Sequence, residues 1–100
     1  MAIDSYTIHV HWDESNAPRQ GNVDVEVRFE NGSRYGATLF TIDNITSLMK
    51  SYEESGECRS GSYFWAADLI ILRRLSMTEI SKTVADLVGK SEFFKAFSRL

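Results

Sequence analysis

The two histidines of the chain lie two residues apart, and an aspartate follows at the same spacing, as His9, Val10, His11, Trp12 and Asp13. Residues two apart on a β-strand share a face, so both imidazoles and the carboxylate would meet one metal ion. Such a site would activate water, which makes a small metal-dependent hydrolase one hypothesis. We favour the alternative, polar side chains on the solvent side of a half-buried strand, because such hydrolases need further ligands. We therefore predict no enzyme, no metal and no cofactor.

Two other side chains carry chemistry of their own. Cys58 is the single cysteine, which excludes an internal disulfide and a multi-cysteine zinc site, and we expect an ordinary loop or half-buried thiol. Asp68 lies inside the apolar run 63–72, where a buried carboxylate must be paired. It is either a partner-binding or catalytic acid or, as we prefer, a group that bonds backbone N–H at a turn or pairs with Arg73 or Arg74.

The sequence lacks the motifs of phosphate and nucleic-acid binding. Neither G-x-x-x-x-G-K-S/T, nor G-x-G-x-x-G, nor G-x-S-x-G occurs. The strand aromatics stand among Asp and Glu rather than among basic residues, so we expect no nucleic-acid partner. No run of about 20 apolar residues is present, and the N-terminus does not resemble a secretory signal, so we expect a cytoplasmic protein without a membrane partner.

Charge is distributed unevenly over the 100 residues, which we take as a single domain, 1–100, with a net charge of −3. Residues 1–57 hold ten acids and four bases, whereas residues 58–100 hold four acids and seven bases. An acidic half repels nucleic acid and attracts basic partners. The alternative to partner binding is that the acidic residues form a solvated face that keeps the protein in solution.

The elements that position these residues begin with three strands. Alternation predicts strands over residues 6–12 and 23–30, and Asn31-Gly32 predicts a hairpin to a third strand over 34–40. A three-residue loop, Asn31-Gly32-Ser33 with Gly32 left-handed, keeps the apolar residues on one face. The register this predicts pairs Val25 with Leu39, Val27 with Ala37, Phe29 with Tyr35 and Glu30 with Arg34.

After the third strand, the spacing of apolar residues predicts helices and one further strand. An apolar face from Ile42 to Tyr52 predicts a helix that Thr41 or Asp43 caps and Gly56 ends. The run 63–72 predicts a strand covered on both faces, with Asp68 at a bulge. Ser76 to Glu79 forms a capping box for a helix whose inward residues are Met77, Ile80, Val84, Leu87 and Val88, and Gly89 closes it. Ser91 caps a last helix with Phe93, Phe94 and Phe97.

The predicted fold is α+β, a two-layer sandwich of order β-β-β-α-β-α-α. Because the outer face of the hairpin is charged, the helices must cover the other face of a mainly antiparallel sheet. The crossover from the third strand to the fourth would make those two parallel.

The stretch Val23–Leu75 resembles small bacterial immunity proteins of the polymorphic-toxin, or contact-dependent growth inhibition, type. The residues that carry the resemblance are the acidic hairpin Val23–Gly32, the segment Thr41–Ile45, and Gly61–Ala66 running into Asp68. The resemblance implies a small acidic protein that binds a toxin domain, such as a nuclease, and covers its basic active-site cleft. From charge and exposure we expect the contact residues to be Trp12, Asp13, Glu14, Asp24, Glu26, Glu30, Tyr35, Glu53, Glu54 and Glu57.

A third class of function stays open beside the immunity protein and the hydrolase. A homodimeric adaptor domain would pair through an edge strand or through the C-terminal Phe helix, if one of its rings is left exposed.

Overall fold

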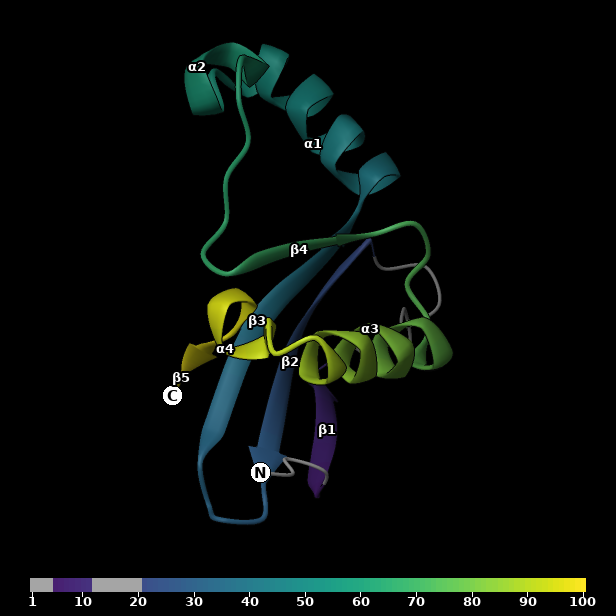
Figure 1. Cartoon of the computed structure of the whole chain (residues 1–100). Coiled ribbons are helices and arrows are strands. Elements are labelled where there is room, and N and C mark those ends of the chain that lie inside the picture. The colour runs from purple at the N-terminus through teal and green to yellow at the C-terminus, as the bar shows by residue number, and fades with distance from the viewer. Residues whose placement is uncertain (1–4, 12–20) are drawn as a thin grey trace.

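The computed structural model describes residues 5–11 and 21–100 and shows an α+β fold, in which two helices cover one face of a mainly antiparallel sheet (Figure 1). The predicted class and the order of its elements are confirmed, with one short helix and one short strand in addition. In chain order the elements are β1 (Tyr6–His11), β2 (Asn22–Phe29), β3 (Arg34–Thr41), α1 (Ile42–Ser55), α2 (Glu57–Gly61), β4 (Leu69–Leu72), α3 (Met77–Gly89), α4 (Phe93–Ala96) and β5 (Ser98–Arg99).

The sheet has the strand order β1-β2-β3-β4. The pairs β1–β2 and β2–β3 are antiparallel, whereas β3 and β4 are parallel, as the crossover through a helix predicts. The two-residue strand β5 pairs antiparallel with the first part of β3, where Tyr35 lies opposite Arg99. β4 and β5 therefore share the edge of β3 opposite β2: β4 pairs with the last four residues of β3, and β5 pairs with Tyr35 and Gly36.

The register of the β2–β3 hairpin differs from the predicted one by two residues. Val25 lies opposite Ala37 rather than Leu39, and Arg34 lies opposite Arg28 rather than Glu30. The loop has the predicted length but begins one residue earlier, at Glu30, and ends at Gly32 with φ 90°. A type I turn followed by a left-handed residue is a common form of three-residue hairpin, and it selects this register. A shift of two residues leaves each side chain on its predicted face.

The core lies between the sheet and helices α3 and α4. Val25, Val27 and Leu39 are at most 2% exposed and pack against Ile80 and Val84 of α3. Ser76 caps α3 as predicted, since its hydroxyl accepts the Glu79 backbone N–H at 3.1 Å. Of the predicted inward face of α3, Met77 differs: it lies at the first turn and is 43% exposed.

Two predictions for the C-terminal half are wrong. The fourth strand covers only Leu69–Leu72 and is not buried on both faces, because Ile71 is half exposed and only Leu72 is buried. The last helix is the single turn α4, which begins after Glu92 without a side-chain cap, and Ser91 instead has a positive φ of 60°. The chain bends at Ser91 because Glu92 N–H bonds back to the Leu87 carbonyl at 2.9 Å and closes α3.

Helix α1 differs most from expectation. It begins and ends as predicted, with the Thr41 hydroxyl accepting Asn44 N–H at 3.1 Å and Gly56 left-handed at its end. However, none of its fourteen residues is buried. It extends away from the sheet, turns through α2, and returns along residues 62–68 to β4 (Figure 1). We call α1, α2 and residues 62–68 the arm; with it the molecule measures 49 × 28 × 21 Å.

Candidate interaction surface

The hairpin acid at the centre of the predicted surface is already paired. Glu26 is only 6% exposed, and its carboxylate accepts from Arg28 Nε at 2.5 Å and from Arg34 Nε at 2.7 Å. Hydrogen bonds from Arg34 and Arg28 lower the Glu26 pKa to about 2. Glu26 therefore neutralises two arginines that lie directly opposite each other across the hairpin.

This arrangement predicts an acid-sensitive stability. The ordinary pKa of a glutamate is 4.5, so the lowered pKa stabilises the fold above pH 4.5, and this contribution is lost as the pH falls toward 2. We expect Glu26→Gln to lower the free energy of unfolding at pH 7 and to remove part of its decline between pH 4.5 and 2. Urea unfolding across this pH range measures both. Glu30→Gln is the matched control, because it also removes an acid from the hairpin but, among the described residues, one that forms no ion pair. Equal slopes for both variants would contradict the role of Glu26.

The other predicted contact residues of the hairpin are spread over both faces. Asp24 is exposed and its carboxylate accepts from the Thr38 hydroxyl at 3.1 Å, and Glu30 is exposed in the turn. Tyr35, expected as an exposed anchor, instead lies half-buried on the core face, with its ring 5.6 Å from Phe93. The predicted contacts Trp12, Asp13 and Glu14 lie outside the described residues.

The three remaining predicted acids lie at the opposite end of the molecule. Glu53 and Glu54 are in the last turn of α1, Glu57 begins α2, and all three are exposed. The hairpin turn and this end of the arm occupy the two extremes of the long axis (Figure 1). Those of the predicted acids that the structure describes thus form two separate groups rather than one surface.

The tip of the arm holds an uncommon backbone conformation. Cys58, Arg59 and Ser60 have φ values of 48°, 53° and 56°, so α2 is a left-handed turn of non-glycine residues. L-residues in this region bring Cβ close to the following carbonyl oxygen. Tyr52 packs beside this turn: burial raises the pKa of its hydroxyl, and the neighbouring Cys58 and Glu57 raise it further.

Relieving this strain should stabilise the protein. We expect Arg59→Gly to raise the free energy of unfolding by about 1 kcal/mol, because glycine adopts positive φ without a Cβ clash. Arg59→Ala is the matched control, since it also removes the guanidinium but keeps Cβ. Urea unfolding of both variants separates the backbone effect from the charge effect. A glycine variant no more stable than the alanine variant would contradict strain at this position.

Two large aromatic side chains of the arm, missed from the sequence, are exposed. Tyr63 is 48% and Trp65 69% exposed, whereas Phe64 between them is half-buried with its ring 4.9 Å from that of Phe40. The sequence suggested a buried strand because the run is apolar apart from Asp68. The available signal was Gly61, which ends α2 two residues before Tyr63 and indicates that the run begins in a loop outside the core.

Of the residues first considered for catalysis, the two histidines share one face of β1, as predicted. His9 and His11 lie on the outer face of the sheet, opposite Glu26 and Asp24, and His9 Nε2 lies 3.0 Å from the Thr7 hydroxyl. The third residue of the motif, Asp13, lies outside the described residues. Among residues 5–11 and 21–100, no three His, Cys, Asp or Glu side chains are grouped to hold a metal ion.

Asp68 differs from the buried acid expected. It is exposed, has a positive φ of 51°, and accepts the Ser98 hydroxyl at 2.5 Å rather than pairing with Arg73 or Arg74. Its backbone carbonyl accepts Thr38 N–H at 3.0 Å. Asp68 therefore ties the start of β4 to the C-terminal strand and to β3.

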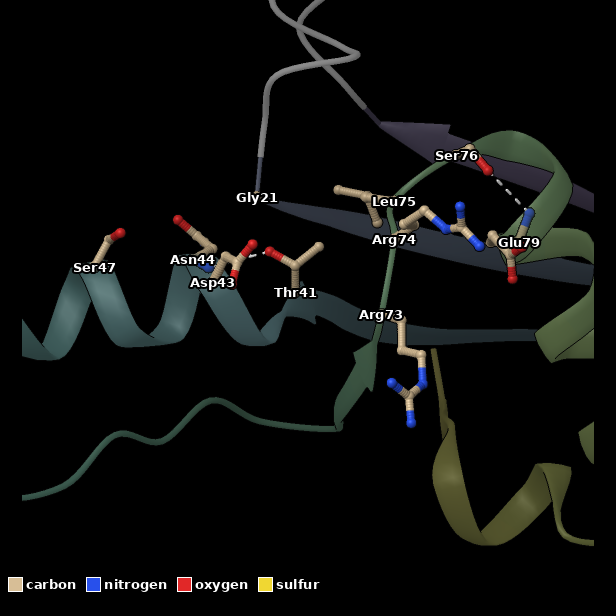
Figure 2. A pocket seen from close by; sticks show the side chains of 10 residues that line it. All are labelled: Gly21, Thr41, Asp43, Asn44, Ser47, Arg73, Arg74, Leu75, Ser76 and Glu79. Atoms are coloured by element: carbon tan, nitrogen blue, oxygen red, sulfur yellow. Dashed lines mark hydrogen bonds between the residues drawn. The ribbon is translucent and has the colours of Figure 1, made fainter.

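A polar hollow of about 710 Å³ lies where α1 and α3 begin (Figure 2). The two acids of its described lining, Asp43 and Glu79, balance its two arginines. Figure 2 shows Arg74 extending toward Glu79, while Arg73 points away from the start of α1. The described lining is thus balanced in charge, which does not favour a strongly charged ligand. Its lining is Gly21, Thr41, Asp43, Asn44, Ser47, Arg73, Arg74, Leu75, Ser76 and Glu79.

Comparison with protein-family models, with curated proteins and with solved structures finds no match to this chain. In the part of the chain that the structure describes, no helix has both the length and the apolar character needed to cross a membrane. Function is therefore inferred from the residues and their geometry.

Proposed function

We propose that this chain is a small acidic binding protein of the immunity type, which neutralises a toxin domain by covering a basic surface of it. The observation that carries this proposal is the arm. No side chain of this fourteen-residue helix is fully buried, and its apolar face from Ile45 to Tyr52 is only half-buried. It therefore gains less from packing within its own fold than a core helix does, because helices in proteins are stabilised mainly by packing of an apolar face. An element of this kind is understandable when a second molecule packs on it.

The composition of the arm supports a protein partner over a small ligand. Exposed Tyr63 and Trp65 are residue types that concentrate in protein interfaces, and the arm carries five acids against two bases. The polar hollow at the start of α1, by contrast, is open and balanced in charge. Small-molecule sites are mostly apolar and enclose their ligand.

The homodimeric adaptor is the second candidate, because Phe94 on α4 is 47% exposed. Sedimentation of the purified chain distinguishes it: an adaptor gives a mass near twice the monomer that depends on concentration.

A growth assay tests the immunity proposal. The tagged full chain is used to recover a partner from its native lysate at low and high salt, and the basic domain of that partner is then expressed in a host. We expect this domain to arrest growth alone and not when the chain is co-expressed. A partner without toxicity, or toxicity that the chain does not relieve, would refute the proposal.

A further inference from the structure

The acids of the hairpin are poorly suited to attract a basic partner. Glu26 is buried in its ion pairs with Arg28 and Arg34, so its charge is already balanced. Asp24 is the remaining acid of β2, and it is engaged with the Thr38 hydroxyl. The open face of the hairpin thus carries two arginines against two acids, and its net field is weak.

The acids of the arm remain available. Among the described residues, neither Glu53, Glu54 nor Glu57 forms an ion pair, and all three are exposed. They lie around the C-terminal end of α1, where the helix dipole adds partial negative charge. The tip carries these three acids against one base, Arg59, so among the described residues it is the more negative end of the long axis.

An apolar anchor lies on the same arm. Exposure alternates along residues 63–67: Tyr63, Trp65 and Ala67 are exposed, whereas Phe64 and Ala66 are half-buried. Phe64 packs on Phe40 and fixes this alternation, so the rings of Tyr63 and Trp65 face away from the body. Gly61 contacts α1 near Glu53, because a Cβ built on it would meet the Glu53 side chain at 3.4 Å. The aromatic segment thus starts beside the glutamates.

The backbone of this segment has no pairing partner in the described part of the chain. Within the described part of the chain, residues 63–67 belong to no strand pair and make no backbone–backbone hydrogen bond. Their N–H and C=O groups are therefore available to an approaching chain, in the manner of an added strand. An interface here would combine side-chain anchors with backbone hydrogen bonds.

A second copy of this chain fits the arm poorly. Antiparallel pairing of two α1 helices about their centres would bring Asp43, in the first turn of one helix, close to Glu53 of the other. Parallel pairing would bring the glutamates of both copies together. Both arrangements place like charges side by side, which is unfavourable in an interface.

We infer that the partner docks on the arm, with Trp65 as the central anchor in an apolar slot of the partner and with basic groups of the partner facing Glu53, Glu54 and Glu57. This inference rests on the proposed function for the kind of partner. It assigns the contact surface to residues 53–65 rather than to the acidic hairpin. A truncated central aromatic anchor typically costs at least about 2 kcal/mol of binding energy, which corresponds to roughly a 30-fold loss of affinity.

A displayed library of random 15-residue peptides, panned against the immobilised full chain, tests the surface without knowledge of the natural partner. We expect enriched peptides that combine Lys or Arg with a large apolar residue. Fluorescence anisotropy should show at least about 30-fold weaker binding to Trp65→Ala and about 10-fold weaker binding to Glu53→Lys/Glu57→Lys at low salt. Met77→Ala, an exposed apolar residue on α3, is the matched control and should bind as the wild type does.

Each other outcome overturns the inference. Peptides that bind Trp65→Ala as tightly as the wild type, peptides that respond only to Asp24→Lys, or a library without enriched sequences would move the surface away from the arm. A dimer that Trp65→Ala dissolves would make a second copy the occupant. Because Trp65 is largely exposed, urea unfolding should show the variant folded, which separates binding from stability.

The growth assay keeps this inference distinct from the proposed function. Relief of toxicity that persists in Trp65→Ala, with unchanged affinity for the toxin domain, would refute the arm and leave the immunity function standing. Peptide binding on the arm together with a non-toxic natural partner would refute the immunity function and leave the arm as the docking surface.

Discussion

Phe93→Ala is expected to lower the free energy of unfolding by about 3–5 kcal/mol, the usual range for a phenylalanine truncated in a core. Phe93 is 1% exposed and lies at the centre of an aromatic cluster. Its ring centroid lies 5.3 Å from that of Phe29, 5.6 Å from Tyr35 and 4.3 Å from Phe97. A loss of this size is a large part of the 5–15 kcal/mol that stabilises a typical domain.

Phe94 provides a control on the same helical turn. Its ring also lies near Phe29 and Tyr35, but it is 47% exposed, so Phe94→Ala should cost only about 1 kcal/mol. Urea unfolding of both variants gives the comparison. Similar losses of stability in the two variants would contradict the placement of Phe93 in the core and of Phe94 at the surface.

Gly61→Ala is expected to destabilise the arm by about 2–4 kcal/mol. Gly61 has φ 83°, and a Cβ built on it would lie 2.2 Å from the backbone carbonyl oxygen of Met49. The methyl group would thus meet both a disfavoured backbone conformation and a rigid neighbour in α1. Because the arm carries no part of the buried core, we expect the loss to be local.

Hydrogen exchange of the α1 amides measures this local loss. Gly32→Ala is the matched control, since Gly32 also has a positive φ, 90°, but nothing lies within 4 Å of its Cβ position. That variant should cost about 1 kcal/mol and leave α1 protection unchanged. Equal protection of α1 in both variants would show that Gly61 does not hold the tip against α1.

Much of the fold can be predicted from the periodicity of the apolar residues and from the residues that cap the helices. The alternation of Val23 to Phe29 placed the apolar residues of β2 on the core face, and Thr41 and Ser76 marked the starts of α1 and α3. These are local effects, so the sequence alone is sufficient to predict them. The hairpin register escaped prediction because two loops of equal length, starting at Glu30 or Asn31, keep the same faces.

The candidate surface was harder to predict from the sequence, because it consists of side chains that do not pack into the core. The apolar spacing from Ile42 to Tyr52 is the same whether a helix covers a sheet or extends from it, and only tertiary structure separates the two. Likewise, the charge pattern of the sequence could not show that Glu26 forms ion pairs with Arg28 and Arg34, and the apolar pattern could not show that Trp65 is exposed. The acids of the arm were identified correctly as exposed, but their separation from the hairpin depends on the fold.

A parallel capture experiment tests the central claim, that a basic protein docks on the arm. Tagged wild type, Trp65→Ala and Asp24→Lys are presented to the same native lysate at low and high salt, and captured proteins are quantified by mass spectrometry. The account predicts one stoichiometric basic partner that binds wild type and Asp24→Lys, is weakened by salt, and is lost from Trp65→Ala. A partner retained by Trp65→Ala and lost from Asp24→Lys would contradict it and return the interface to the hairpin.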